Sequence, residues 1–286
     1  MDNNLSIRPL QSQDDYAQCV ALQYEIWGAD FGECAPPSLL LATQQVSGIA
    51  AGAFDSEGRL LGFVFGIGGQ RQGRSAHWSD MLGVREDCRG YGVGQRLKLY
   101  QRRQLLMYGI ELAYWSYDPL EARNAHLNIN RLGALPIEYV RDMYGDASSP
   151  LHAGLGTDRF IVEWQLEAPH VEAALAGKPR PIAFPAGAPV VNSRLEAGKP
   201  QPRSPDLPGV SELRIEVPAD IQETKSRSPQ EAAAWRDCTR VAISHYVVRG
   251  YRIVGFERDL ENTRCFYLFA QPISESKTRR SLEHPH

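Results

Sequence analysis

The sequence lacks any run of about 18 consecutive apolar residues, so it offers no candidate for a membrane-spanning helix. Its first residues, MDNNLSIRPL, also lack the basic start and the long apolar run of a secretory signal peptide. Both absences argue against a membrane protein or a secreted one. We therefore expect a cytoplasmic protein with no membrane partner.

Cysteine pairs, metal-ligand clusters and an excess of one charge are also missing. The five cysteines are scattered, form no CxxC pair and are odd in number, which argues against a disulfide framework. No His, Cys and carboxylate residues have the spacing of metal ligands, so no metal is expected. The net charge of −3 gives no reason to expect nucleic acid as a partner.

What the sequence does contain is the composition of a normal globular core, with 43% hydrophobic residues over 286 positions. Apolar periodicity predicts the order β-α-β-β-β-α-β-α-β-β, a mixed α/β sheet within residues 1–167. The expected strands are residues 5–9, 46–54, 60–67, 76–84, 112–117, 134–143 and 159–166. The expected helices are residues 11–27, 92–108 and 121–132, and Pro36-Pro37 is expected to break the chain.

The composition changes after residue 167. Nine of the chain's 19 prolines lie between residues 168 and 210, which predicts a linker rather than a packed domain. Residues 211–272 then predict a strand, a helix and two more strands, a C-terminal β-α-β-β half-domain. Residues 273–286 are expected to be a disordered tail.

Three glycines fall within five residues between a predicted strand and a predicted helix, in Arg89-Gly-Tyr-Gly92-Val-Gly94. Glycine lets the main chain approach an anion closely, and the start of a helix directs free N–H groups at the same place. Arg89 and Arg96, with Lys98 further on, would add positive charge. The alternative is an ordinary strand-to-helix turn. The spacing matches neither a dinucleotide fingerprint nor a P-loop.

The same six residues resemble the R/Q-x-x-G-x-G/A motif of the GNAT superfamily of acyl-CoA-dependent N-acyltransferases. The preceding strand, SDMLGV, and the later segment NAHLNINRLGA are also similar to the family's patterns. The resemblance covers residues 5–167. It implies the GNAT fold, here with an additional C-terminal GNAT-like half-domain, and a coenzyme A thioester as co-substrate.

The longer layout of the chain resembles a bacterial subgroup of this superfamily. In that subgroup a proline-rich stretch and a further segment follow the first domain, as they do here. The subgroup includes succinyl-CoA-dependent acyltransferases that act on amino acids. The resemblance thus implies transfer of an acetyl or succinyl group to the amine of a small acceptor, with an amino acid as the expected partner. A homodimer is also possible.

The resemblance implies roles for residues on both sides of the glycine turn. Leu82 would donate a backbone N–H to the thioester carbonyl, and Val84 would pair with the pantetheine arm. The diphosphate would lie on the turn, and Asn124 matches an asparagine that contacts the cofactor arm or caps the later helix. The residues expected at the diphosphate are Arg89, Gly90, Tyr91, Gly92, Val93 and Gly94.

Asp80 is the expected general base. Side chains alternate along a strand, so Trp78, Asp80, Leu82 and Val84 are expected on one face and His77 on the other. Asp80 would then act near the Leu82 amide, and a local hydrogen bond at the end of the strand is the alternative reading. A β-bulge in this strand would exchange the faces of Asp80 and His77.

The general acid is harder to assign, because Ile129 stands where the family has a tyrosine. Asn128, Asn130 and Tyr117 are possible substitutes, and water is another. Trp78, Tyr117, Arg123 and Arg141 are expected to bind the acceptor, since arginine suits a carboxylate. Arg236, Arg240 and Arg249 offer the same chemistry from the C-terminal half-domain.

Two other functions are compatible with the sequence. One is a sensor or scaffold that binds CoA without turnover, and the other is an acetyltransferase of peptides or proteins. The C-terminal half-domain is expected to extend the first sheet or to form a dimer contact, and to form a wall of the acceptor pocket.

Overall fold

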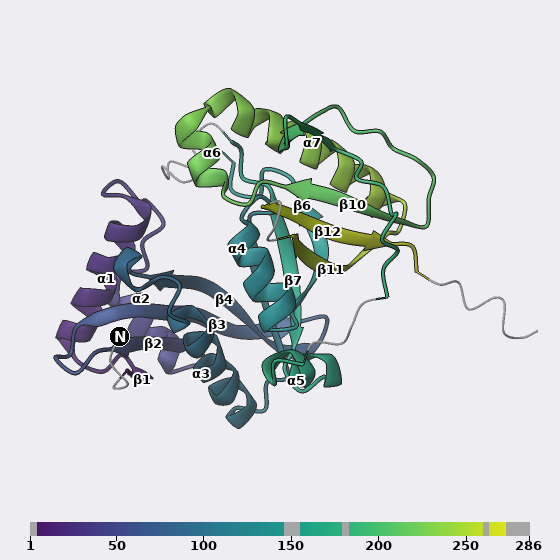
Figure 1. Cartoon of the computed structure of the whole chain (residues 1–286). Helices are drawn as coiled ribbons and strands as arrows, with labels where there is room; N and C mark the ends of the chain where they lie inside the picture. The colour runs from purple at the N-terminus through teal and green to yellow at the C-terminus, as the bar shows by residue number, and fades with distance from the viewer. Residues whose placement is uncertain (1–4, 146–154, 179–182, 260–262, 273–286) are drawn as a thin grey trace, which may run out of the picture.

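The computed structural model describes residues 5–145, 155–178, 183–259 and 263–272 (Figure 1). The predicted tail at 273–286 lies outside the described residues. The central element is a seven-stranded mixed sheet in the order β1-β2-β3-β4-β5-β7-β6, so the predicted mixed α/β class is confirmed. Its strands are β1 (Ser6–Pro9), β2 (Ile49–Phe54), β3 (Leu60–Arg71), β4 (Arg74–Val84), β5 (Leu112–Tyr117), β6 (Leu135–Val140) and β7 (Arg159–Gln165).

The helices of this first part cover both faces of the sheet. They are α1 (Gln13–Trp27), α2 (Pro37–Gln44), η1 (Glu86–Cys88), α3 (Val93–Met107), α4 (Ala122–Ala125), η2 (His126–Arg131) and α5 (Pro169–Leu175). A capping box starts α1, since Asp15 N–H donates to the Ser12 hydroxyl and the Asp15 carboxylate accepts from Ser12 N–H. The predicted break at Pro36-Pro37 marks the end of the non-helical stretch after α1, but the helix that follows was not predicted. Pro37 is the first residue of α2, where its missing N–H is not needed.

Two apolar layers separate the helices from the sheet. Leu22 of α1 packs in one buried cluster with Phe63 and Met81, whereas Leu97 of α3 packs in another with Val64. Figure 1 shows α1 and α3 on opposite sides of the strands. The element that follows the glycine turn is therefore fixed against one face of β3 and β4.

The C-terminal region forms a second, three-stranded antiparallel sheet in the order β10-β12-β11. Its elements are β10 (Glu212–Val217), α6 (Ile221–Arg227), α7 (Pro229–Val248), β11 (Arg252–Asp259) and β12 (Arg264–Ala270). The expectation that this region extends the first sheet was wrong, because no strand of one sheet pairs with a strand of the other among the described residues. The additional C-terminal region itself is confirmed.

Residues 168–210 are more structured than a simple linker. They contain α5 and the hairpin of β8 (Ser193–Glu196) with β9 (Lys199–Pro202). Val171 and Asn192 are fully buried. The Asn192 side chain donates to the Glu216 carbonyl and accepts from the Glu216 N–H, both at 2.8 Å. The segment thus packs on its neighbours, although the domain boundaries given above stay a prediction.

The C-terminal sheet docks on the second half of the first sheet, and one continuous apolar core joins the two. The rings of Phe160 on β7 and Tyr267 on β12 lie 5.3 Å apart. Asn130 on η2 donates to the Phe256 carbonyl on β11 at 2.9 Å. This docking places the C-terminal region beside the end of β5, where the candidate site lies.

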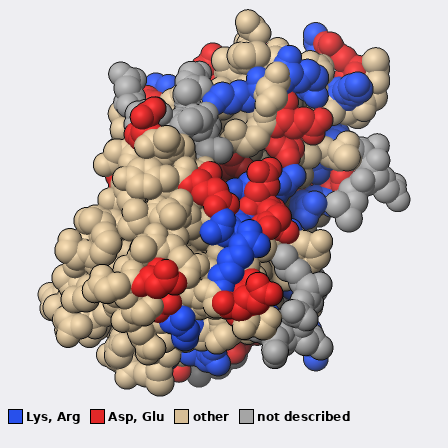
Figure 2. All heavy atoms as spheres, turned by 90° about the vertical axis from the view of Figure 1, so that its left-hand side faces the viewer, with Lys and Arg blue, Asp and Glu red and all other residues tan. Residues whose placement is uncertain are grey.

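Within the described ranges, no helix is long and apolar enough to cross a membrane. The same ranges contain no group of three or more His, Cys, Asp or Glu residues able to hold a metal ion. On the face shown in Figure 2, acidic and basic side chains are interspersed, and neither sign forms a continuous patch there.

Candidate active site

Strand β4 carries a β-bulge in its middle. Phe65 of β3 pairs with Met81 and Ile67 pairs with Trp78, so one β3 residue opposes two β4 residues, Ser79 and Asp80. The β3 residue is Gly66, and a Cβ on it would lie 2.5 Å from the Trp78 carbonyl oxygen. The bulge therefore requires glycine on the facing strand.

The bulge changes which β4 side chains share a face. Trp78 and Asp80 lie together, with Trp78 Nε1 donating to Asp80 Oδ1 at 3.3 Å. Leu82 and Val84 instead contact α3, each 3.7 Å from the position of a Cβ on Gly94. The prediction that Asp80 shares a face with Leu82 and Val84 was wrong, because it assumed regular alternation.

His77 takes the face that a bulge was expected to give it. Its side chain is fully buried, and its Nε2 lies 3.0 Å from Gln101 Nε2 on α3. Burial, followed by the neighbouring Lys98 charge, lowers the pKa of His77 to about 3, so the ring is neutral near pH 7. His77 is thus a core residue of the α3 side.

Strands β4 and β5 are parallel but separate soon after they meet. The two strands share two residue pairs, His77 with Ala113 and Trp78 with Tyr114. Strand β5 continues to pair with β7 as far as Tyr117. Beyond Trp78, the edge of β4 that faces β5 has no strand partner in the described part of the chain. Backbone groups on such an edge are available to an extended ligand with amides of its own.

The direction of the Leu82 amide follows from the pairing on the other side of β4. Arg85 N–H donates to the Leu61 carbonyl on β3 at 2.9 Å. Since backbone groups alternate sides along an antiparallel strand, Gly83 also faces β3, while Leu82 and Val84 face β5. The Arg89 guanidinium donates to the Val84 carbonyl at 3.2 Å on that open edge.

The glycine turn leads directly from β4 to α3. Gly90 and Gly92 have φ values of +84° and +78°, a region that glycine enters without the strain other residues incur. A Cβ at either position would meet nothing within 4 Å. Gly92 precedes α3, and no side chain caps the start of this helix. The free N–H groups of the first turn therefore face open space, as an anion site requires.

Of the three basic residues expected at the glycine turn, only Arg89 lies there. Arg96 is exposed and donates to the Leu5 carbonyl beside β1. Lys98 is buried between α3 and the sheet, so its expected role at the anion was wrong. Arg131 of η2, which the sequence analysis missed, donates to Gln95 in the first turn of α3 at 3.3 Å. No local pattern links these residues, because the fold joins them across 36 positions.

The remaining residues of the turn fit a main-chain role. Tyr91 is exposed and Val93 is buried under the start of α3, so neither side chain is needed for the turn to bind an anion. Asn124 is an exposed residue inside α4, whose N-cap is Glu121. The expectation that Asn124 caps that helix was wrong, while its contact with the cofactor arm stays a prediction.

Asp80 is placed where a base would be useful. Its side chain reaches solvent from the bulge, yet the surrounding protein withholds enough water to raise the pKa of Asp80 above its ordinary value. The hydrogen bond from Trp78 opposes this shift only in part. Its carboxylate projects from the strand that also carries the outward Leu82 amide.

The four residues predicted to bind the acceptor lie in different surroundings. Trp78 is half-buried beside Asp80. Tyr117 is 5% exposed, and its ring packs against that of Phe160. Arg123 forms an exposed ion pair with Asp220 at 2.7 Å. Arg141 is exposed directly after β6. Only Trp78 is in contact with the candidate base.

The possible general acids are mostly committed to packing. Ile129 is buried in the core. Asn128 accepts a hydrogen bond from Trp115 Nε1 at 3.3 Å, and Asn130 donates to the Phe256 carbonyl. A phenol that does lie near the end of β5 is Tyr144, whose hydroxyl is 2.9 Å from Ser116 Oγ.

The C-terminal region holds the segment that follows β5, which we call the 118–123 segment. Arg236 donates to Asp118 at 2.6 Å and the Tyr267 hydroxyl to the Pro119 carbonyl at 2.9 Å. Gln222 donates to Glu121 at 2.7 Å, and Arg123 pairs with Asp220. Residues about a hundred positions later thus hold the segment that directly follows β5.

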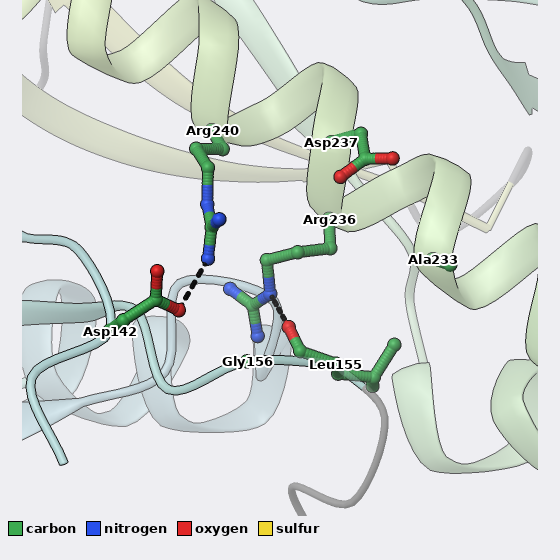
Figure 3. Close-up of a pocket in the computed structure, with 7 residues that line it drawn as sticks. All are labelled: Asp142, Leu155, Gly156, Ala233, Arg236, Asp237 and Arg240. Atoms are coloured by element: carbon green, nitrogen blue, oxygen red, sulfur yellow. Dashed lines mark hydrogen bonds and ion pairs between the residues drawn. The ribbon is translucent and has the colours of Figure 1, made fainter. Parts of the chain in front are cut away.

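A cavity of about 220 Å³ lies at this junction (Figure 3). Arg236 and Arg240 reach into it from α7. Arg236 is already bound to Asp118 and to the Leu155 carbonyl, and Arg240 to Asp158 and Asp142. The expectation that these two arginines bind a substrate carboxylate is not favoured, because their charges are matched within the protein.

No family model matches the chain, and no curated protein does so either. Solved structures that it is similar to include a chain of the NatC complex bound to Gag peptide and CoA, at 14% identity and a TM-score of 0.46 over 57% of this chain and 98% of that one. Aminoglycoside 6'-acetyltransferase type Ii is 17% identical, with a TM-score of 0.45 over 57% of this chain and 98% of that one. Ard1 from Thermoplasma volcanium is 15% identical, with a TM-score of 0.42 over 56% of this chain and 95% of that one.

Proposed function

We propose that the protein is an acyl-CoA-dependent N-acyltransferase of the GNAT type. It transfers an acetyl or succinyl group from CoA to the amine of a small acceptor, with an amino acid as the preferred class. The observation that carries the proposal is the open glycine turn at residues 89–94, which joins the unpaired edge of β4 to the uncapped start of α3.

The residues of the chain fit a CoA thioester. The amides of the turn and of the first turn of α3 would hold the diphosphate, with Arg89 and Arg131 adding charge. The outward backbone groups of Leu82 and Val84 would pair with the amides of the pantetheine arm. The bound thioester supplies the activated acyl group.

Two groups of β4 would then serve the reaction. The Leu82 N–H points to the open edge and would donate to the carbonyl oxygen as negative charge develops there. Asp80, directly or through water, would accept a proton from the attacking amine. As the amine nitrogen bonds to the carbonyl carbon, the carbon–sulfur bond breaks and CoA leaves as a thiolate that takes a proton from water. Asp80 and Leu82 project from opposite faces, so we expect the acceptor to approach from the face of α1 and α2.

The acceptor side of the site would involve the C-terminal region. It holds the 118–123 segment in place, and we expect the held segment to narrow the space beside β5. This favours a small acceptor over a peptide laid along an open groove. Of the two arginines predicted to bind the acceptor in the first domain, Arg141 is the better candidate for its carboxylate, since Arg123 is paired with Asp220.

A donor-by-acceptor screen tests this function. CoA binding is measured by calorimetry, and thiol release is followed from acetyl-CoA and succinyl-CoA with D- and L-amino acids. We expect CoA binding and thiol release far above the rate without acceptor. Binding without release would favour a sensor, release with peptides alone would favour a peptide acetyltransferase, and absence of binding would refute the proposal.

Asp80→Asn is expected to reduce kcat/KM by about 100-fold, the scale of one general base. In the wild-type protein, kcat/KM should fall as the pH drops through the pKa of Asp80, because protonation removes the base. Since burial raises this pKa, the fall should come at a higher pH than an ordinary aspartate gives.

The variant should lose this acidic limb while its CoA affinity stays within about threefold, measured by pH–rate profiles and calorimetry. The exposed Asp206→Asn, between β9 and β10, is a matched control that should change neither quantity. An unchanged acidic limb in Asp80→Asn would rule Asp80 out as the base.

A further inference from the structure

A polar cluster is buried between β4 and α3, directly beneath the bulge. Lys98 of α3 is 2% exposed, and its Nζ donates to Ser79 Oγ at 2.7 Å and to Gln101 Oε1 at 3.2 Å. The Gln101 amide continues the cluster to His77. The Lys98 ammonium also lies 3.8 Å from the centre of the Trp115 ring on β5.

A lysine in this position is costly for the fold. Burying an ammonium group is unfavourable unless a charge of opposite sign compensates it. In the part of the chain that the structure describes, no carboxylate forms an ion pair or hydrogen bond with Lys98. The side chain is also not required for packing, since methionine has a similar length and shape. What the Lys98 ammonium adds over methionine is a donor to Ser79 and Gln101, and of its two hydrogen bonds the one to Ser79, at 2.7 Å, is the shorter.

Ser79 is one of the two β4 residues that form the bulge. If β4 slipped by one residue into regular pairing, the sides of its backbone groups would be exchanged. Leu82 N–H would then point at β3 instead of the open edge. A hydrogen bond from the rigid α3 to Ser79 opposes this slip.

We infer that Lys98 is a positioning residue for acyl transfer, which acts through Ser79 to keep the β4 bulge in register and the Leu82 amide directed at the thioester. The inference rests on the proposed function for its catalytic consequence. The cluster and the bulge are independent of that function.

The position of Lys98 also predicts a pH dependence. Burial lowers the pKa of Lys98 to about 7, so its charge is lost as the pH rises through neutrality. The groups that face it are Ser79 and His77 from β4, Gln101 from α3 and Trp115 from β5. Of these four, His77 is the one that can gain a proton, and with a pKa of about 3 it stays neutral over the pH range in which Lys98 loses its charge.

The test compares Lys98→Met with wild-type protein, with the exposed Lys199→Met on β9 as the matched control. We expect Lys98→Met to lower kcat by about tenfold while the CoA dissociation constant changes by less than about threefold. The ratio of wild-type to variant kcat should be largest below pH 7 and fall above it. Hydrogen exchange of the amides in residues 79–84 should be about tenfold faster in the variant.

Ser79 variants approach the same bond from its other end and disturb packing less. Ser79→Ala should reproduce the loss in kcat and the faster exchange, whereas Ser79→Thr, which keeps the hydroxyl, should restore both. Wild-type kcat and unchanged exchange in Lys98→Met and Ser79→Ala would overturn the inference. If wild-type protein neither binds CoA nor releases thiol, the proposed function fails, and the exchange rates alone decide whether Lys98 holds the bulge.

Discussion

The double variant Gly90→Ala/Gly92→Ala is expected to bind CoA about 300-fold more weakly than the wild-type protein, a loss of about 3 kcal/mol. Both positions have φ near +80°, and the space beyond each Cβ position is open. The new methyl groups would occupy the space from which a diphosphate reaches the turn amides. Calorimetric titration with CoA measures the effect.

The same substitutions also strain the backbone, by about 1 kcal/mol at each site. Gly58 and Gly109 make a matched control, because they have φ values of +82° and +71° and equally open surroundings. Gly58→Ala/Gly109→Ala should lose the same stability in urea and keep wild-type CoA affinity. Equal affinity in the two double variants would show that the diphosphate does not lie on residues 89–94.

Arg236→Met is expected to lower the free energy of unfolding by about 3 kcal/mol. Arg236 and Asp118 are 3% and 7% exposed and form an ion pair at 2.6 Å. Removal of the arginine leaves the Asp118 carboxylate buried without its nearest positive charge. Urea denaturation measures the loss, and limited proteolysis should show earlier cleavage between the two parts of the chain.

Arg123→Met is the control at the same junction. Its partner is Asp220, but the Arg123 side chain is 75% exposed, so solvent screens the pair and the expected loss is below about 1 kcal/mol. The variant Arg236→Met/Asp118→Leu should recover only part of the stability, because it removes the charge left unpaired by Arg236→Met but also takes the partner of the buried Arg159, 3.8 Å away. A loss at Arg236 no larger than at Arg123 would mean that the buried pair does not hold the C-terminal region.

The element order and the glycine turn could be predicted from the sequence because both depend on local signals. The apolar residues of the 60–67 and 76–84 stretches and the helical spacing after Gly92 are properties of short windows. Gly90 and Gly92 stand out for the same reason, since few residues accept a positive φ. The helix at 37–44 was missed because Pro37 was read as a break rather than a first helical residue.

The details of the candidate site depend on tertiary structure and could not be predicted from short sequence windows. The bulge at Ser79 and Asp80 is a property of the pairing with β3, and it decides which side chains face α3. Lys98 resembles a surface lysine of a basic helix until the sheet covers it. Arg131 and the C-terminal contacts of the 118–123 segment join residues that no sequence window spans.

The contacts of the 118–123 segment bear on the order in which the chain folds. During synthesis, residues 1–167 would emerge with Tyr117 and Phe160 uncovered, because Tyr267 and Arg236 are made later. A nascent chain of that length would have its glycine turn in place but an unsupported wall and an exposed apolar surface. For the proposed reaction, competence to bind both substrates should therefore arise only when β12 has been translated and docked.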